Sequence, residues 1–348
     1  MRMLRCGACE DVLEVVYAAP PSGGEPRLPL LDPGRRISLG EGGTPLLGLP
    51  KLASELGLGS LRVKLEFQSA TGSFKDRGSS VLISAAVENR VEEFVEDSSG
   101  NAGASLSAYA AAAGLRAHVF APASAAKGKL DQIAVFGATL HPIEGPRQAA
   151  TDAAQAFVRE RGLPYLSHNL SPYFLEGMKS FAYEVAEGEA ALPADIVLPV
   201  GNGSLLIGMF KGFQELVEAG RIDRAPRLHC VQSEAVRPLV AALNGEDWEM
   251  APDARTVASG ISVAEPPRLQ EMVSVVRESG GSGMAVTDAA MLAWQRRLAA
   301  SAGVFCEATS AAALAGLESL LASGAIAPGA DVLVPLTGSG LKEPLAEA

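Results

Sequence analysis

The sequence predicts a two-domain α/β protein in which mostly parallel, twisted sheets are flanked by helices. Short apolar strands alternate with Ala-rich helical segments, and glycines stand at the turns between them. The chain has 348 residues, which at a prior of about 150 residues per domain corresponds to roughly two domains.

The individual elements follow from runs of apolar residues between turn residues. We expect strands at 61–65, 91–96, 117–121, 139–143, 196–200, 228–232 and 331–335. We expect helices at 79–88, 102–113, 125–136, 147–161, 173–187, 205–219, 287–301 and 310–323. Gly114 and Gly162 follow two of these helices, where a left-handed residue commonly ends a helix.

Residues 1–40 are predicted to be an extension, because prolines and glycines interrupt any regular element there. The extension contains Cys6-x-x-Cys9 but no second pair at the spacing of a zinc ribbon, so we predict no metal site. No apolar stretch has the length of a signal peptide or a membrane span. We therefore expect a cytoplasmic protein with reduced thiols.

The charge balance narrows the range of partners. The chain has 29 Lys and Arg against 40 Asp and Glu, a net charge of −11 with His neutral. Such a chain lacks the broad basic field that nucleic acid or an anionic membrane requires. We expect neither as a partner, although a local site for a small anion stays possible.

Two glycine- and hydroxyl-rich stretches lie in the first half of the chain. In 69–78, Lys75 begins a helix beside Arg77, and a nearby cation, partial burial and a helix N-terminus all disfavour the ammonium form of a lysine. Such a lysine suits Schiff-base chemistry, although a solvated helix-start lysine explains this stretch alone. In 97–104, Asn101 and small residues precede a helix whose amides can face an anion, but an ordinary tight turn has the same composition.

Two more such stretches follow strands in the second half. In 199–205, Gly201, Gly203 and Ser204 stand between an apolar strand and a helix, which is the design of a phosphate cradle. The stretch is neither G-x-G-x-x-G nor a P-loop, so a dinucleotide or nucleoside triphosphate is not supported. In 335–342, Thr337 follows the last strand and can hydrogen-bond the edge of a ring, although a surface turn is the simpler reading of this stretch alone.

Taken together and in this order, S-F-K-D-R-G, S-S-G-N-A-G, V-G-N-G-S and T-G-S-G-L-K resemble the fold-type-II pyridoxal-phosphate-dependent enzymes, most closely the threonine synthases. The resemblance runs from about Gly40 to Lys342. It implies a tryptophan synthase β-like fold with a smaller domain inserted in a larger one. We expect an extension at 1–40, a large cofactor-binding domain at 41–66 and 176–348, and an inserted domain at 67–175.

The resemblance also implies a role for each matching residue. Lys75 would bind pyridoxal 5'-phosphate covalently and then shuttle protons at the substrate carbons, as the catalytic residue. Asn101 would bind the ring oxygen of the cofactor, and Thr337 would face its pyridine nitrogen. The residues that would hold the cofactor phosphate are Gly201, Asn202, Gly203, Ser204 and Leu205. The residues that would receive the substrate carboxylate are Ser98, Ser99, Ala102 and Gly103.

By the same resemblance, the expected reaction is that of a lyase which converts O-phospho-L-homoserine and water to L-threonine and phosphate. Asp76, directly after the lysine, follows the threonine synthase pattern. The substrate phosphate needs a cationic pocket. The candidate cations are Arg77, Lys127, Lys129, Arg147 and Lys179. We prefer Lys127 and Lys129, because they stand in a Ser/Ala/Gly loop at a helix start.

Two alternatives stay open. Ser69-Ala70 and Ser339 differ from the threonine synthase pattern beside the active site, which leaves room for β-elimination or β-replacement on serine, threonine or an activated serine. The other alternative is a non-catalytic metabolite-binding relative. The expected partners are a small-molecule amino-acid substrate and, by resemblance, a second copy in a homodimer.

Overall fold

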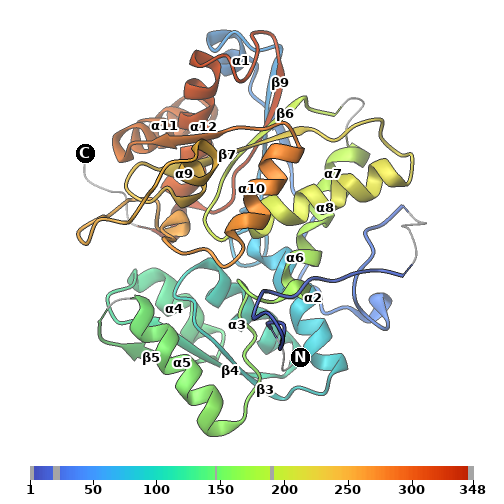
Figure 1. Cartoon of the computed structure of the whole chain (residues 1–348), viewed down its shortest axis with the longest axis vertical. Coiled ribbons are helices and arrows are strands. Elements are labelled where there is room, and N and C mark those ends of the chain that lie inside the picture. The colour runs from blue at the N-terminus through green and yellow to red at the C-terminus, as the bar shows by residue number, and fades with distance from the viewer. Residues whose placement is uncertain (1–3, 19–23, 146, 189–191, 344–348) are drawn as a thin grey trace. The chain divides into compact units, whose positions relative to one another are not determined.

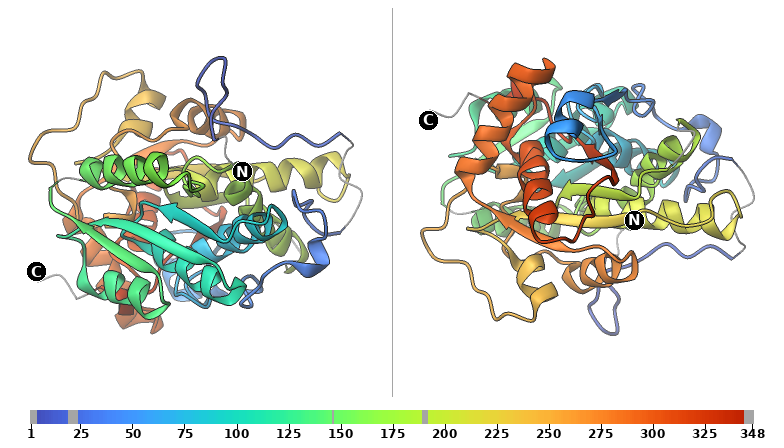
Figure 2. Two further views of the ribbon diagram at one scale, coloured as in Figure 1. Left: turned by 90° about the horizontal axis from the view of Figure 1, so that it is seen from below. Right: turned by 90° about the horizontal axis from the view of Figure 1, so that it is seen from above.

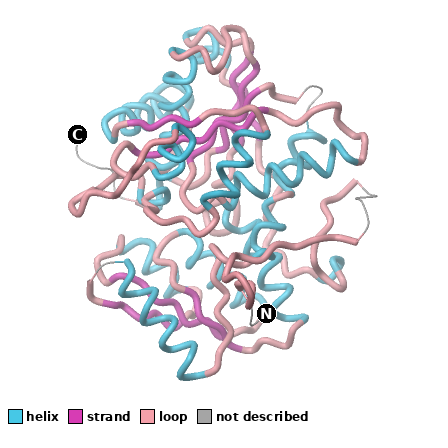
Figure 3. The backbone as a smooth tube through the Cα atoms, in the orientation of Figure 1, coloured by secondary structure: helices cyan, strands magenta, loops and turns pink. Residues whose placement is uncertain are grey.

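The computed structural model describes residues 4–18, 24–145, 147–188 and 192–343, and these form two compact units. Unit 1 contains Arg27–Gly42, Ser69–Met178 and the described part of Met1–Ala19. Unit 2 contains Gly43–Gln68 and the described parts of Pro20–Pro26 and Lys179–Ala348. Each unit combines a largely parallel sheet with helices (Figures 1 and 3), which confirms the predicted α/β class. The domain limits given above stay a prediction.

Unit 1 is built on a three-stranded parallel sheet in the order β3-β4-β5. Its strands are β3 (Glu93–Glu96), β4 (Arg116–Pro122) and β5 (Thr139–Ile143). Its helices are α2 (Lys75–Glu88), α3 (Asn101–Ala113), α4 (Lys127–Val135), α5 (Arg147–Arg161) and α6 (Pro172–Met178). Alternation along β4 directs Phe120 toward α5 and Val119 toward α3 and α4, so helices cover both faces of the sheet (Figure 2).

Unit 2 is built on a six-stranded sheet in the order β1-β2-β9-β6-β7-β8, parallel except for the pairing of β1 with β2. Its strands are β1 (Leu46–Gly48), β2 (Ser60–Lys64), β6 (Asp195–Pro199), β7 (Arg227–Ser233), β8 (Gly283–Val286) and β9 (Asp331–Pro335). Its helices are α1 (Pro50–Glu55), α7 (Ser180–Gly188), α8 (Ser204–Glu218), α9 (Pro238–Asn244), α10 (Leu269–Glu278), α11 (Asp288–Ala302) and α12 (Ala308–Ala322).

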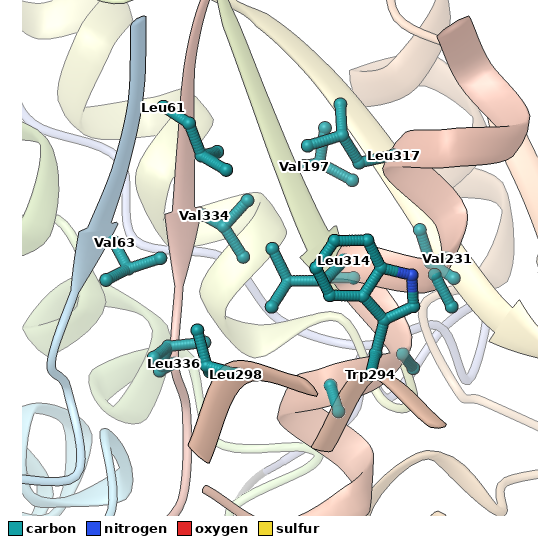
Figure 4. Close-up of a cluster of buried hydrophobic side chains, with 14 of the residues drawn as sticks. Leu61, Val63, Val197, Val231, Trp294, Leu298, Leu314, Leu317, Val334 and Leu336 are labelled. Atoms are coloured by element: carbon teal, nitrogen blue, oxygen red, sulfur yellow. The ribbon is translucent and has the colours of Figure 1, made fainter. Parts of the chain in front are cut away.

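The largest part of the core of unit 2 lies where α11 and α12 pack on the sheet. Trp294 from α11 and Leu314 from α12 lie against Val197, Val231 and Val334 of three adjacent strands (Figure 4). All five side chains are buried, and burial of one such side chain stabilises a fold by about 1.5–3 kcal/mol. This packing fixes the carboxyl ends of β6 and β9, from which two of the predicted functional loops emerge.

The predicted strands are all present, and so are the predicted helices apart from the one at 173–187, with ends shifted by up to four residues. The prediction missed β1, α1, α9, α10 and β8. Apart from α10, these elements are short, and a short apolar run fits a helix and a strand equally well.

The single helix predicted at 173–187 is wrong, because the chain forms α6 and α7 with a break at Lys179. Each of these two helices is positioned by a close contact within its own unit. In unit 1, Gly177 of α6 lies so close to α2 that an added Cβ would stand 2.1 Å from the carbonyl oxygen of Arg77. In unit 2, the fully buried Lys179 donates a hydrogen bond of 2.6 Å to Glu215 of α8. The sequence has no local breaker that announces this.

The described part of the N-terminal extension is mostly irregular, as the prolines predicted, apart from a short 3-10 helix at Pro33–Arg35, and its residues from Arg27 onward are fixed to unit 1. The backbone N–H of Ile37 donates to Ser84 Oγ at 2.8 Å, and those of Leu31 and Asp32 both donate to the Glu88 carboxylate at 3.0 Å. Within the described ranges, no three His, Cys, Asp or Glu side chains gather as a metal site, and no helix is long and apolar enough to cross a bilayer.

Candidate active site

In unit 1, the stretch 69–78 places Lys75 as the first residue of α2, as predicted. The next residue, Asp76, is fully buried. Its carboxylate accepts hydrogen bonds from the backbone N–H of Thr71 at 2.8 Å and from the hydroxyl of Ser105 in α3 at 2.6 Å. Asp76 therefore closes the loop before Lys75 and ties the first turn of α2 to α3.

The side chain of Lys75 is half-buried against aromatic rings. Its Nζ lies 4.5 Å from the ring centre of Phe74 and 5.8 Å from that of Phe174 in α6. Rings at this distance attract the ammonium form by their quadrupole and exclude water from one side of the amine. The lysine therefore has a defined direction within unit 1.

The loop 97–100 joins β3 to α3, so that Asn101, Ala102 and Gly103 form the first turn of a 13-residue helix. The first backbone N–H groups of a helix have no acceptor within it, and no side chain caps them here. They form a site suited to a carboxylate. Gly103 is required, because an added Cβ would stand 2.0 Å from the carbonyl oxygen of Ser98.

Two consecutive carboxylates stand where β3 ends and this loop begins, and each is buried against a different partner. Glu96 Oε1 lies 2.5 Å from His168 Nδ1. Asp97 Oδ2 accepts hydrogen bonds from Thr151 at 2.6 Å and forms an ion pair of 3.1 Å with Arg147 of α5. These contacts connect the amino side of the loop to segments more than 40 residues further along the chain.

The protonation of these groups follows from their burial. Burial and the charge of Asp97 raise the pKa of Glu96 well above its usual range. Burial and the charge of Lys75 lower the pKa of His168 well below its usual range. Burial alone would raise the pKa of Asp97, but the guanidinium of Arg147 and the hydrogen bonds from Thr151 and Tyr165 together outweigh it, and the pKa is lowered. Asp97 is therefore ionised, whereas Glu96 and His168 together retain a proton.

In unit 2, the loop after β6 leads into α8. Gly203 has a φ of +78°, precedes the first residue of the 15-residue helix, and no side chain caps that helix. An added Cβ at Gly201 would stand 2.9 Å from the carbonyl oxygen of Gly260. The backbone N–H groups of the first turn, from Ser204 onward, are therefore free of intrahelical acceptors, at a place where no Cβ intrudes.

Thr337 follows β9, the neighbour of β6 in the sheet. Its hydroxyl lies 3.0 Å from the hydroxyl of Ser310 in α12, and Ser310 Oγ accepts the backbone N–H of Gly338 at 3.0 Å. All of this is buried. Because adjacent parallel strands end at the same edge of the sheet, unit 2 presents the glycine loop and the Thr337 hydroxyl together.

The predicted residues thus fall into two sets. Unit 1 brings together Lys75, Ser98, Ser99, Asn101, Ala102 and Gly103, and unit 2 brings together Gly201, Asn202, Gly203, Ser204, Leu205 and Thr337. Among the candidate cations in unit 1, Lys129 and Arg77 are buried, whereas Lys127 is 86% exposed and lies 2.5 Å from Asp131.

Sequence reasoning missed Glu96, Asp97 and Ser310. The contact of Glu96 with His168 joins residues 72 positions apart, which no local pattern indicates. One local feature indicates the two carboxylates themselves: Glu96 and Asp97 are consecutive at an otherwise buried strand end. Charged residues are rarely buried in such a place unless they are paired.

Comparison with known proteins gives a consistent result. The model of the family described as pyridoxal-phosphate dependent enzyme matches residues 37–338. The threonine synthase of Methanocaldococcus jannaschii is 36% identical over 321 residues, which cover 91% of this chain and 79% of that protein. The threonine synthase of Mycobacterium leprae is 34% identical and covers 91% of this chain and 87% of that protein. The solved T.th. threonine deaminase is 25% identical with a TM-score of 0.73, covering 88% of this chain and 95% of that one.

Proposed function

The chain belongs to the pyridoxal-phosphate-dependent enzyme family, and from this premise we propose that it converts O-phospho-L-homoserine and water to L-threonine and phosphate. The chain is an enzyme that depends on pyridoxal 5'-phosphate. The finer proposal is carried by its 36% and 34% identity to threonine synthases over 91% of its length.

The residues of unit 2 fit the phosphate of this cofactor. Gly203, with its φ of +78°, is followed by backbone N–H groups of α8 that have no intrahelical acceptor. A helix N-terminus of this kind attracts an anion through its N–H groups and its dipole. We propose Gly201, Asn202, Gly203, Ser204 and Leu205 as the phosphate loop.

The hydroxyl of Thr337 also fits a neutral pyridine nitrogen. The hydrogen on an alcohol can be donated to that nitrogen, while the oxygen is held by Ser310 at 3.0 Å. When bound, the cofactor withdraws electrons from the neighbouring substrate carbons, so that protons are lost and regained there more easily. A hydroxyl partner leaves the ring less electron-withdrawing than an Asp partner would, which favours elimination and replacement over transamination.

In unit 1 we propose Lys75 as the cofactor-binding lysine and as the base that moves protons at the substrate α and β carbons. The rings of Phe74 and Phe174 limit the directions open to its amine. The N–H groups at the start of α3, with Ser98 and Ser99, would hold the substrate carboxylate, and Asn101 would bind the ring oxygen of the cofactor.

A second candidate is elimination from serine or threonine with release of ammonia. It is favoured by the pairing of candidate phosphate-binding cations with carboxylates. Arg147 is 3.1 Å from Asp97, and Lys179 is 2.6 Å from Glu215. A paired cation has less charge to offer a substrate phosphate. The 25% identity to a threonine deaminase points the same way.

The two activities are separated by product analysis. Release of phosphate and threonine from O-phospho-L-homoserine supports the first proposal, and release of ammonia from threonine or serine alone supports the second. Borohydride reduction followed by peptide mapping tests the lysine independently, and a label on any residue other than Lys75 would refute the proposed site. We also propose a homodimer, for which sedimentation equilibrium is the measurement.

A further inference from the structure

The pair of Glu96 and His168 in unit 1 has no role in the mechanism above. Glu96 ends β3 with its side chain fully buried, and His168 is 5% exposed. Glu96 Oε1 lies 2.5 Å from His168 Nδ1, and Oε2 accepts the backbone N–H of the same residue at 3.3 Å. Both oxygens are thus committed to one residue, in a site from which water is excluded.

The same strand holds a second pair that differs in one respect. Glu93 Oε1 lies 2.5 Å from His118 Nε2, but the Glu93 side chain is 27% exposed. The hydrogen bond from His118 lowers the pKa of Glu93, as in an ordinary surface ion pair. The Glu93–His118 pair therefore offers a matched control for the buried pair three positions along the strand.

The charged groups around the buried pair come from several elements. Lys75 of α2 and Arg147 of α5 act on both members of the pair, and Asp97 follows Glu96 directly. Tyr165 lies on the segment that pairs with β3, and its pKa is raised by burial and by Asp97. Arg147 forms an ion pair of 3.1 Å with Asp97, and Lys75 is the other cation that acts on both Glu96 and His168.

A direct line of contacts also connects the pair with Lys75. The His168 ring lies edge-on to Phe174, with ring centres 5.7 Å apart and a 66° angle between the planes. Lys75 Nζ lies 5.8 Å from the centre of the same Phe174 ring. The imidazole therefore supports the aromatic surface on which the lysine rests.

We propose that Glu96 and His168 are positioning residues that act through Lys75, sharing one proton as a buried pair so that they present no net charge to the lysine. Wherever the shared proton sits, on Oε1 or on Nδ1, the pair as a whole stays neutral. A neutral neighbour does not stabilise the ammonium form of Lys75, which leaves its amine available as a base. This inference rests on the proposed role of Lys75 as the cofactor-binding lysine.

The test is the pH dependence of the cofactor absorbance of the holoenzyme, which needs no turnover. In Glu96→Gln, an uncharged amide replaces one member of a pair that has no net charge, so we expect the midpoint of the absorbance change to stay at that of the parent. In Asp97→Asn, a neighbouring ionised carboxylate is removed, so we expect the midpoint to move to lower pH by about one unit. In His118→Gln, the control, we expect no movement.

Each outcome decides the matter. A midpoint that moves in Asp97→Asn and stays in Glu96→Gln supports the neutral pair, because the absorbance then responds to a charge at this loop and finds none on Glu96. A midpoint that moves to lower pH in Glu96→Gln overturns it, because that substitution would then have removed a negative charge, and a midpoint that moves in neither variant overturns it because Lys75 then does not respond to this site. In the parent protein, a His168 NMR signal that titrates near pH 6.5 also overturns it, without any variant. If borohydride labels a residue other than Lys75, the proposed site fails first; if it labels Lys75 and the midpoints behave in either of these two ways, the pair alone fails.

Discussion

Replacing Gly203 with alanine tests the proposed phosphate loop against a control on the same helix. Gly203 and Gly220 flank α8 at its two ends, with φ angles of +78° and +65°. An alanine in this left-handed region costs about 1 kcal/mol relative to glycine at either position. At Gly220 nothing lies within 4 Å of an added Cβ, whereas at Gly203 it would stand 2.2 Å from the sulfur of the fully buried Met272.

The two variants should therefore differ by the cost of moving Met272 or the loop. We expect Gly220→Ala to lose about 1 kcal/mol of unfolding free energy. We expect Gly203→Ala to lose about 2–4 kcal/mol, since overpacking a core adds about 1–3 kcal/mol. Urea unfolding of the cofactor-free proteins measures both values.

The affinity for the cofactor then distinguishes a role of the loop in phosphate binding from its contribution to stability. If the loop holds phosphate, its displacement in Gly203→Ala should weaken pyridoxal 5'-phosphate by about 5–30-fold, which is the loss of about 1–2 kcal/mol of charged hydrogen bonding. Pyridoxal without phosphate should be affected little, and Gly220→Ala should bind both compounds as the parent does. Equal cofactor affinities for the two alanine variants would refute the assignment of the loop.

Three further predictions follow from individual contacts. Asp76→Asn should lower the unfolding free energy by about 2–4 kcal/mol in urea titration, since an amide cannot accept all the hydrogen bonds that the buried carboxylate accepts. An unchanged unfolding midpoint would contradict the role of Asp76 in closing the loop. Thr337→Val should alter the absorbance spectrum of the holoenzyme and lower kcat at nearly unchanged stability. Ser310→Ala should change the spectrum and kcat more weakly, since Ser310 acts by orienting the Thr337 hydroxyl at 3.0 Å. Burial alone would raise the pKa of Asp195, but the hydrogen bonds from His229 and Arg227 together lower it, so its stabilisation should be complete above about pH 5 and be lost as the pH falls through the folded pKa. In Asp195→Asn, the unfolding free energy should therefore fall less steeply with decreasing pH than in the parent, while Asp97 still contributes in both proteins; equal slopes in an acid titration of unfolding would contradict this role of Asp195.

Local patterns were sufficient for most of the secondary structure and for the placement of the glycine-rich loops between strands and helices. Apolar runs bounded by glycine predicted the strands, and the position of Lys75 at a helix start was confirmed. These features depend on residues within a few positions of one another, which is the range over which backbone preference and helix capping act. The break at Lys179 was not predictable in this way, since its cause is the contact with Glu215, 36 residues further on.

The sequence by itself determined the α/β class, the family, and the order of the loops that carry glycine, hydroxyl and lysine side chains. Only the tertiary structure decided which charged groups are paired. It pairs Arg147 with Asp97, and it buries His168 against Glu96, which lies 72 residues away along the chain. The physical reason is that a buried charge is stable only with a partner, and the partner is brought near by folding and not by spacing along the chain.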